Sequence, residues 1–387
     1  MKLRFFRVLT LILSLALLTA CSSGDENRPM EGVSTATLRA VGDIFLGAEM
    51  VADGRTMLGD YDFRPTFEQV FPVLSDADIT IGNFEGNFAG GGEGSYPDAL
   101  AETLASSGID ILQTANSYSV TNGLSGLQRT REILIQNGIT PLGTYSSAEE
   151  WENNPVHVVE INVISFAFVA FTKGVQGMGL PAGAEHNVNL LYTDYTTDYE
   201  DINQTEILSI LEAARETNPD FIIAALHWGS ENISGISSSQ KSITNLMLQN
   251  GVDVILGSHS HRLEQVETRE VVMEDDTVKT CVIAYNLGDF CTTQPGKCNT
   301  SIVLNLEFTR NHATKECTIS DVSYIPVSTV DNEDLYANQF AVVPTDDAIA
   351  LYEGNYYLRV SKSAYLEMVD DSEDLEETLF PPVEEEE

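Results

Sequence analysis

From Thr37 onward, short apolar runs alternate with longer stretches in which apolar residues recur at helical spacing. The run from Val252 to Leu256 is one example, because it has the length of a buried strand and is bounded by glycines. Alternating strands and helices predict an α/β fold with parallel strands. The last runs, from Val271 to Val327, follow one another without helical stretches. We therefore expect antiparallel strands to complete mixed sheets.

Several stretches carry helix signals, and we expect helices over 66–77, 98–107, 124–137, 201–217 and 238–250. Glycines at 138 and 251 fit left-handed caps at two of their ends. The β-rich run over 157–172 predicts two antiparallel strands that turn near 160–162. The glycine-rich stretch 86–94 lacks the Gly-Lys-Ser/Thr ending of a P-loop, and we expect it to cross the mouth of the sheet.

Polar side chains that can bind metal stand where the apolar runs end. The carboxyl ends of parallel strands meet at one edge of a sheet, which is where ligands bind in such folds. Taken singly, Asp43 could cap a turn, Asn116 could hold one, and each histidine could be a plain loop residue. Their repeated placement favours a shared site. The group comprises Asp43, Glu85, Asn116, His227, His259 and His261.

This mixture of carboxylates, an amide and imidazoles predicts divalent metal ions as cofactors, two of them, of the Mn, Fe or Zn kind. Two such ions could bind a phosphate-like oxyanion and activate a water molecule. His259 and His261 are two of only six histidines in the chain, yet they lie within three positions. A chance cluster is therefore the weaker interpretation.

The charge balance excludes one class of partner. Asp plus Glu number 59 against 20 Lys plus Arg, which gives a formal net charge of -39. Nucleic-acid binding depends on clustered Lys and Arg, so we expect no nucleic-acid partner. The same charge would repel an anionic polymer unless a metal ion or a local basic patch intervenes.

The first 21 residues predict export rather than a part of the fold. A basic start, MKLRFFR, precedes the apolar run VLTLILSLALL, as in secretory signals. The sequence LTAC at 18–21 resembles the lipobox of bacterial lipoproteins, in which Cys21 becomes the lipidated N-terminus. The alternative is an ordinary signal peptide. With 22–32 as a flexible tether, we expect a lipid-anchored protein at the outer face of the bacterial cytoplasmic membrane.

Four further cysteines lie late in the chain, where an oxidising compartment would permit disulfides. Cys291 and Cys298 flank a turn-rich segment and could close a small loop, which leaves Cys281 and Cys317 to pair. Other pairings stay open, because spacing alone does not fix connectivity. A zinc site built from cysteines is disfavoured, since the chain has no CxxC pair.

The alternation of strands and helices weakens beyond about Val330. We therefore expect one domain over 33–330 and a C-terminal extension over 331–387. Tyrosines and apolar residues indicate that part of the extension packs on the domain. Its end, from Val369 onward, is strongly acidic, and we expect this tail to be disordered.

Six short motifs occur in the order and spacing of a known family. They are AVGDIFLG at 40–47, IGNFEG at 81–86, TANSYSVTNGLSGLQRT at 114–130, ALHWGSE at 225–231, GVDVILGSHSH at 251–261 and YNLGDF at 285–290. The chain thus resembles the poly-γ-glutamate capsule-biosynthesis (CapA-type) proteins, which share the calcineurin-like metallophosphoesterase fold. The resemblance covers about Thr37 to Phe290.

The resemblance implies a four-layer αββα sandwich with mixed sheets and a metal centre at its edge. It also implies a role with capsule or envelope polymer, and membrane capsule-synthesis proteins as partners. Its motifs place metal ligands at Asp43, Glu85, His227, His259 and His261.

The third motif departs from the family pattern, which is Ala-Asn-Asn-His followed by an aspartate three residues later. At the corresponding positions this chain has Asn116, Ser117, Tyr118 and Thr121. In metallophosphoesterases the asparagine of the Asn-His pair binds metal and the histidine protonates the leaving group. Tyrosine has a reference pKa of about 10, which suits proton donation at neutral pH poorly.

Two interpretations follow. The first is an anchored, metal-dependent hydrolase of capsule polymer or a phosphoester, with His261 and Tyr118 as catalytic residues, Asn116 as an additional ligand, and water as the alternative proton donor. The second is a non-catalytic polymer-binding or assembly factor on the same fold, which the altered third motif favours. A periplasmic-type binding protein would need two similar lobes, and the sequence offers no second lobe.

Overall fold

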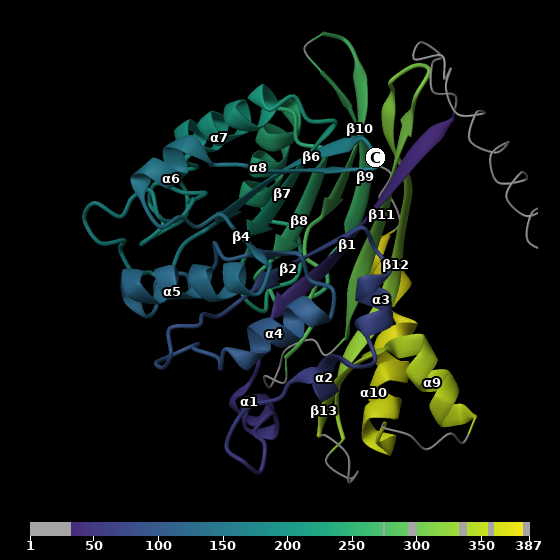
Figure 1. The fold of residues 1–387 in the computed structure, drawn as a ribbon. Helices are drawn as coiled ribbons and strands as arrows, with labels where there is room; N and C mark the ends of the chain where they lie inside the picture. Colours follow the sequence, from purple (N-terminus) through teal and green to yellow (C-terminus); the bar gives the residue numbers. More distant parts are fainter. Residues whose placement is uncertain (1–31, 274, 293–299, 333–338, 355–359, 382–387) are drawn as a thin grey trace, which may run out of the picture.

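Two mixed β-sheets packed face to face form the centre of the computed structural model (Figure 1). The structure describes residues 32–381, apart from 274, 293–299, 333–338 and 355–359. Helices cover the outer face of each sheet. The predicted four-layer αββα sandwich is therefore confirmed.

The seven-stranded sheet has the order β13-β12-β11-β1-β2-β3-β4. Strands β1 to β4 run parallel to one another, whereas β11, β12 and β13 add antiparallel strands beside β1. The bounds are β1 (Val33–Ile44), β2 (Ile79–Phe84), β3 (Ile111–Gln113), β4 (Thr140–Leu142), β11 (Thr300–Asn311), β12 (Cys317–Asp331) and β13 (Phe340–Pro344).

The six-stranded sheet has the order β5-β6-β7-β8-β10-β9, with antiparallel strands at its two edges. The expected hairpin over 157–172 is confirmed: β5 and β6 turn at Asn162 and Val163, which have φ of 50° and 65°. The bounds are β5 (His157–Ile161), β6 (Ile164–Thr172), β7 (Phe221–His227), β8 (Val254–Ser258), β9 (Val266–Val272) and β10 (Val278–Ala284).

Four of the expected helices form close to their predicted positions: α4 (Ala99–Ser106), α5 (Gly123–Gln136), α7 (Gln204–Glu216) and α8 (Ser238–Gln249). Gly138 and Gly251 follow α5 and α8 with positive φ, as predicted. The helix expected over 66–77 is instead split into α2 (Arg64–Phe67) and α3 (Phe71–Ser75). Pro72 lies in the first turn of α3, and its missing N–H prevents one helix from continuing through it.

Three apolar clusters hold the layers together. One fills the space between the sheets with residues such as Leu38, Phe166 and Leu304. A second joins the outer face of the seven-stranded sheet to α2–α5, and a third joins the other sheet to α7 and α8. Figure 1 shows these helices on opposite sides of the paired sheets. Short helices α1 (Ala48–Asp53) and α6 (Ala148–Asn153) lie in connections.

The C-terminal region is part of the same domain, which corrects the boundary expected at residue 330. Strand β12 crosses that position, and β13 pairs with it antiparallel. The expected disorder from Val369 is also wrong for the residues up to 381. Helices α9 (Thr345–Glu353), α10 (Lys362–Glu373) and α11 (Leu375–Leu379) follow, and both ends of α11 are buried in the cluster between the sheets. Burial of Leu375 and Leu379 supplies the free energy that orders α11, although the composition of this region is acidic.

Cys281, Cys291 and Cys317 are free thiols. The pairing of Cys281 with Cys317 is therefore wrong. Cys281 lies on β10 with its thiol 3.6 Å from the carbonyl oxygen of Val252, whereas Cys317 begins β12 in the other sheet. Cys298, offered by the sequence as a partner for Cys291, lies outside the described residues.

Within the described ranges, no helix is both long and apolar enough to span a bilayer. The expected signal at 1–21, with Cys21, and nearly all of the tether at 22–32 lie outside those ranges.

Candidate metal centre

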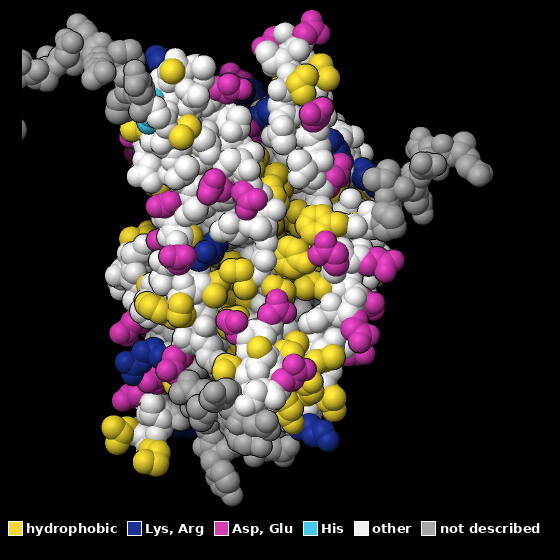
Figure 2. All heavy atoms as spheres, turned by 90° about the vertical axis from the view of Figure 1, so that its right-hand side faces the viewer, with side chains coloured by type: hydrophobic (Ala, Val, Ile, Leu, Met, Phe, Trp, Pro, Cys, Tyr) yellow, Lys and Arg dark blue, Asp and Glu magenta, His cyan; other side chains and the backbone are white. Residues whose placement is uncertain are grey.

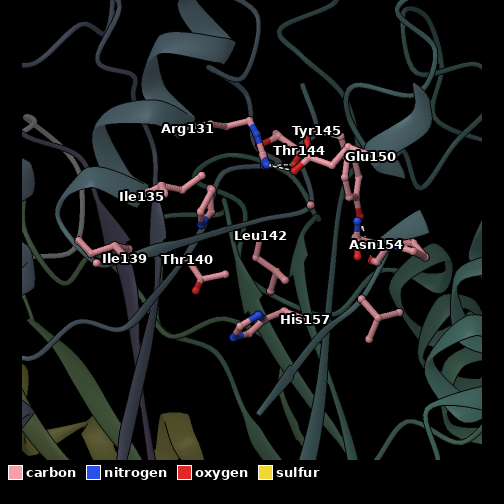
Figure 3. Close-up of a pocket in the computed structure, with 15 residues that line it drawn as sticks. Arg131, Ile135, Ile139, Thr140, Leu142, Thr144, Tyr145, Glu150, Asn154 and His157 are labelled. Carbon is pink, nitrogen blue, oxygen red and sulfur yellow. Dashed lines mark hydrogen bonds and ion pairs between the residues drawn. The ribbon is translucent and has the colours of Figure 1, made fainter. Parts of the chain in front are cut away.

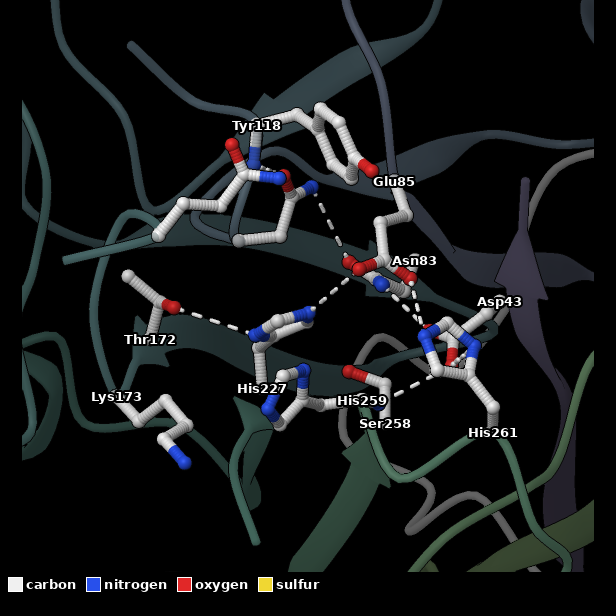
Figure 4. A network of polar contacts seen from close by, with 12 residues as sticks. Asp43, Asn83, Glu85, Tyr118, Thr172, Lys173, His227, Ser258, His259 and His261 are labelled. Carbon is white, nitrogen blue, oxygen red and sulfur yellow. Dashed lines mark hydrogen bonds and ion pairs between the residues drawn. The ribbon is translucent and has the colours of Figure 1, made fainter. Parts of the chain in front are cut away.

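The strand ends of both sheets deliver five predicted ligands to one place (Figure 4). Asp43 is the last residue but one of β1, Glu85 follows β2 directly, and His227 ends β7. His259 and His261 lie in the loop after β8. Each of the five residues is at most 5% exposed. The two sheets thus contribute to one buried polar cluster.

Glu85 stands at the centre of this cluster. Its Oε1 lies 3.5 Å from Nε2 of His227, and its Oε2 lies 3.5 Å from Nε2 of His261. His259 packs beside His227, with ring centroids 4.3 Å apart. Ligand atoms of Glu85, His227 and His259 all lie within 4.8 Å of one another. One carboxylate therefore faces imidazoles on two sides.

Asp289, which the strand-end pattern did not single out, joins the cluster from the segment after β10. Its Oδ1 lies 2.7 Å from Nδ1 of His261. Asp43, His261 and Asp289 form a second group whose ligand atoms lie within 4.8 Å of one another. A signal was present, because Asp289 follows Gly288 in the motif YNLGDF just as Asp43 follows Gly42.

Hydrogen bonds from two neighbours orient Asp43. Asn83 is its register partner in the parallel β1–β2 pair, and Nδ2 of Asn83 donates to Oδ1 of Asp43 at 2.6 Å. The backbone N–H of His259 donates to Oδ2 of Asp43 at 3.1 Å. The sequence placed Asn83 in a motif but gave no signal for its role, because register between strands is a tertiary property.

Glycines allow the loops to approach closely. A Cβ on Gly42 would lie 1.9 Å from the carbonyl oxygen of Gly288, and a Cβ on Gly257 would lie 1.9 Å from that of Tyr285. His259 and His261 have φ of 96° and 58°. Such left-handed conformations cost non-glycine residues about 1–3 kcal/mol each and cluster at functional sites. Close packing around them holds both imidazoles in place.

Burial makes this cluster electrostatically costly without a cation. The pKa of Asp43 is raised to about 8, first by loss of solvation and then by the charge of Glu85. Loss of solvation also lowers the pKa of His227 well below its usual value, so the ring is neutral and able to bind metal. Nε2 of His227 has no hydrogen-bond partner among the described residues. The residues present therefore fit divalent cations.

The side chain of Asn116 lies beside the cluster and links the end of β2 to the loop after β3. Its Nδ2 donates to the carbonyl oxygen of Phe84 at 2.5 Å, and its Oδ1 accepts the backbone N–H of Tyr118 at 2.9 Å. Both ends of the amide are thus engaged in holding the segment that carries the altered third motif. The role of additional ligand stays a prediction, because the hydrogen bond from Tyr118 uses only one of the two lone pairs of Oδ1.

Tyr118 lies at the edge of the same cluster (Figure 4). Its ring centroid is 5.3 Å from that of Phe45, and the glycine-rich loop 86–94 packs against it at Gly94. Loss of solvation and then the charge of Glu85 raise the pKa of Tyr118 to about 12. The hydroxyl therefore stays protonated at neutral pH and is a weaker acid than a free tyrosine.

A separate hollow of about 400 Å³ lies between β4 and the start of β5 (Figure 3). Its polar lining includes Arg131, Glu150 and His157. The guanidinium of Arg131 donates to the carbonyl of Thr144 and to Glu150. None of the predicted ligands lines this hollow. The hollow and the metal cluster are thus distinct features.

Solved structures with similar folds include a calcineurin-like phosphoesterase, YfkN, from Bacillus subtilis and a novel phosphatase from Mycoplasma pneumoniae. The first has a TM-score of 0.44 and 14% identity, covering 77% of this chain and 91% of that one. The second has a TM-score of 0.44 and 12% identity, covering 77% of this chain and 95% of that one.

Sequence relatives include the capsule biosynthesis protein CapA of Bacillus anthracis, which is 24% identical over 272 residues. That match covers 67% of this chain and 60% of the relative. The PGA biosynthesis protein CapA of Bacillus subtilis (strain 168) is 23% identical over 277 residues, which is 67% of each chain. Residues 37–294, which hold the whole metal cluster, match the family described as bacterial capsule synthesis protein PGA_cap. The chain belongs to this family.

Proposed function

We propose that this protein is a metal-dependent hydrolase acting on a capsule or envelope polymer from a lipid anchor at the outer face of the bacterial cytoplasmic membrane. The observation that carries the proposal is the position of Glu85, whose two oxygens each lie 3.5 Å from an imidazole nitrogen. Burial of these carboxylates and imidazoles lowers the stability of the fold unless a cation compensates for it. The arrangement therefore favours a site for divalent cations over a purely structural role.

Five residues would hold the ions: Asp43, Glu85, His227, His259 and His261. When bound, two divalent ions of the Mn, Fe or Zn kind would bind an oxyanion and activate a water molecule. Asn83 keeps Asp43 oriented through its 2.6 Å hydrogen bond. Tyr118 offers a protonated hydroxyl beside the cluster, so either this hydroxyl or water supplies the proton to the leaving group.

The names of the relatives support a polymer substrate, since they describe capsule biosynthesis and PGA biosynthesis. The net charge of -39 opposes an anionic polymer, and Figure 2 shows acidic side chains spread across one face. Metal ions at the cluster would supply the local positive charge that such a substrate needs. Membrane capsule-synthesis proteins would be the partners.

The direction of β1 supports an anchor on the side opposite the cluster. Val33, where β1 begins, and Asp43 are ten residues apart on one extended strand, which corresponds to about 33 Å. An anchor at Cys21 with a tether over 22–32 would therefore join the domain at the end of β1 that lies away from the cluster. A site in that position would meet polymer in the envelope.

A non-catalytic polymer-binding or assembly factor on the same fold is the second candidate. The observation that favours it is the third motif, where Ser117 and Tyr118 replace an Asn-His pair and the side chain of Asn116 is hydrogen-bonded to the backbone of Phe84 and Tyr118. Such a protein would bind the metal ions and the polymer without cleaving a bond.

Metal content and turnover, measured on the purified full chain, separate these functions. We expect bound Mn, Fe or Zn after expression with those metals, and hydrolysis of a generic phosphodiester or of poly-γ-glutamate. His259→Ala removes one imidazole and should abolish that turnover. His312→Gln, which changes a histidine whose Nε2 lies 3.2 Å from Ser34 Oγ outside the cluster, is the matched control and should keep it.

Each outcome points to one function. A chain that binds no metal under these conditions contradicts the hydrolase. A chain that binds metal but turns over neither substrate supports the assembly factor. Equal turnover by the parent and His259→Ala would show that the activity comes from elsewhere.

A further inference from the structure

The two imidazoles that face Glu85 have different partners at their other ring nitrogen, namely Thr172 for His227 (Figure 4) and Asp289 for His261. Thr172 is the register partner of His227 in the parallel β6–β7 pair, and its Oγ1 lies 3.3 Å from Nδ1 of His227. The same hydroxyl donates to the carbonyl oxygen of Gly174 at 2.9 Å. Because its proton is used there, the hydroxyl accepts the N–H of His227 Nδ1. The lone pair of His227 is then on Nε2, which faces Glu85.

Asp289 has the corresponding position behind His261. The 2.7 Å contact engages Nδ1 of His261 with Oδ1 of Asp289, and an ionised Asp289, as beside a bound cation, would accept the N–H of Nδ1. The lone pair of His261 is then on Nε2, which again faces Glu85, at 3.5 Å. Thr172 and Asp289 thus select the same tautomer in the two rings.

The distances between side-chain atoms distinguish metal ligands from residues that only orient a ligand. Two ligand atoms on one tetrahedral ion with bonds of about 2.1 Å stand about 3.4 Å apart. The two 3.5 Å contacts of Glu85 match that spacing. The 2.7 Å contact between Asp289 and His261 is too short for two ligands of one ion and fits a charge-assisted hydrogen bond.

We infer that two ion positions lie on either side of Glu85 and that Asp289 is a positioning residue, which orients His261 toward one of them. Thr172 orients His227 toward the second position. This inference rests on the metal centre of the proposed function. The two positions are unequal, because a carboxylate behind an imidazole raises its basicity more than a neutral hydroxyl does. Loss of Asp289 should therefore cost more affinity than loss of the Thr172 hydroxyl.

Calorimetric titration of the metal-stripped full chain with Mn²⁺ and with Zn²⁺ tests this without any activity assay. We expect two ions to bind the parent. Asp289→Ala should weaken one of them by about 10–100-fold and leave the other unchanged. Asp289→Asn keeps an oxygen that can accept the N–H of His261, so it should recover part of that affinity. Thr172→Val should weaken the other ion, and by a smaller factor.

Asp253→Asn is the matched control, because Asp253 is a buried carboxylate beside the amino-terminal ends of β7 and β8 and far along the strands from the cluster. It should leave both ions unchanged, and thermal melts should show that all four variants are folded. Unchanged binding in Asp289→Ala would overturn the inference. Equal and complete loss of one ion in Asp289→Ala and Asp289→Asn would also overturn it, since that is the behaviour of a direct ligand. A parent that binds no ion would instead refute the metal centre itself.

Discussion

His259 and His261 show how single residues are fixed by their surroundings rather than by their own preferences. Their positive φ angles are unfavourable for a side chain with a Cβ. The loop tolerates them because the strand before it packs tightly at Gly257 and because the N–H of His259 is bonded to Asp43. The placement of both imidazoles and the backbone strain at both residues therefore result from the same close packing.

Gly257→Ala should damage both fold and site. The new Cβ would lie 1.9 Å from the carbonyl oxygen of Tyr285 and 2.7 Å from Nε1 of Trp228, so β8 would have to move. We expect the free energy of unfolding, measured by urea denaturation, to fall by about 1–3 kcal/mol or more. Gly179→Ala, where a Cβ meets nothing within 4 Å, is the control and should change it by less than about 0.5 kcal/mol. Equal stability of the two variants would contradict the close approach.

Glu206 on α7 should make stability depend on pH. Loss of solvation raises its pKa from 4.5 to about 7, against hydrogen bonds from the N–H of Leu190 and from Asn203. Its protonated form is the one favoured by folding. This contribution is therefore fully present below about pH 4.5 and is lost as pH rises through 7.

The measurement is the difference in unfolding free energy between the parent and Glu206→Gln from pH 4.5 to 8. The parent should lose stability relative to this variant across that range. Glu216→Gln, which removes an exposed carboxylate from the same helix, should follow the parent. A difference that stays flat with pH, or that grows in favour of the parent, would contradict the raised pKa.

At the scale of elements, helix α11 attaches the C-terminal region to the domain. It lies within the acidic C-terminal region, yet Leu375 and Leu379 pack into the cluster between the two sheets. Tyr324 on β12 donates a hydrogen bond to Glu376 at 2.6 Å, which fixes the same helix from outside. The C-terminal helices are therefore a structural part of the sandwich.

Leu379→Ala should destabilise the whole domain. The side chain is fully buried, so its truncation leaves a cavity and should lower the free energy of unfolding by about 2–5 kcal/mol. Leu366→Ala on α10 is the control, since that leucine is 54% exposed and its loss should cost little. Chemical denaturation followed by tryptophan fluorescence measures both. A Leu379→Ala variant as stable as the parent would mean that α11 is not docked.

At the scale of the whole molecule, the excess of acidic residues sets the response to salt. A net charge of -39 on the whole chain destabilises the compact state through repulsion among like charges. Salt shortens the range of that repulsion from about 30 Å at 0.01 M to about 8 Å at 0.15 M ionic strength. Stability should therefore be lowest in dilute buffer.

Calorimetric Tm values in a chelator-containing buffer test this expectation. We expect the Tm to rise by a few degrees between 0.01 and 0.15 M NaCl. Glucose at matched osmolality is the control for a general solute effect and should raise the Tm much less. A Tm that stays constant or falls with added salt would show that the surface charges are already compensated.

Much of the fold was predictable because its signals are local. The run from Val252 to Leu256 overlaps β8 (Val254–Ser258), and the turn near 162 separates β5 from β6, since apolar runs and turn residues act over a few positions. The failures have local causes too. Pro72 interrupts a helix that the spacing of apolar residues favoured. The acidic composition of the C-terminal tail predicted disorder, whereas the leucines of α11 are buried between the sheets.

The sequence by itself determined that polar side chains of the types that can bind metal end the strands, from Asp43 to His261. Only the tertiary structure decided which atoms meet. The N–H of His259 reaches Asp43 across 216 positions, and Asp289 and Thr172 support their imidazoles through sheet register and loop packing. The physical reason is that hydrogen bonds depend on tenths of an ångström, whereas a sequence pattern fixes only the strand and the end at which a residue lies.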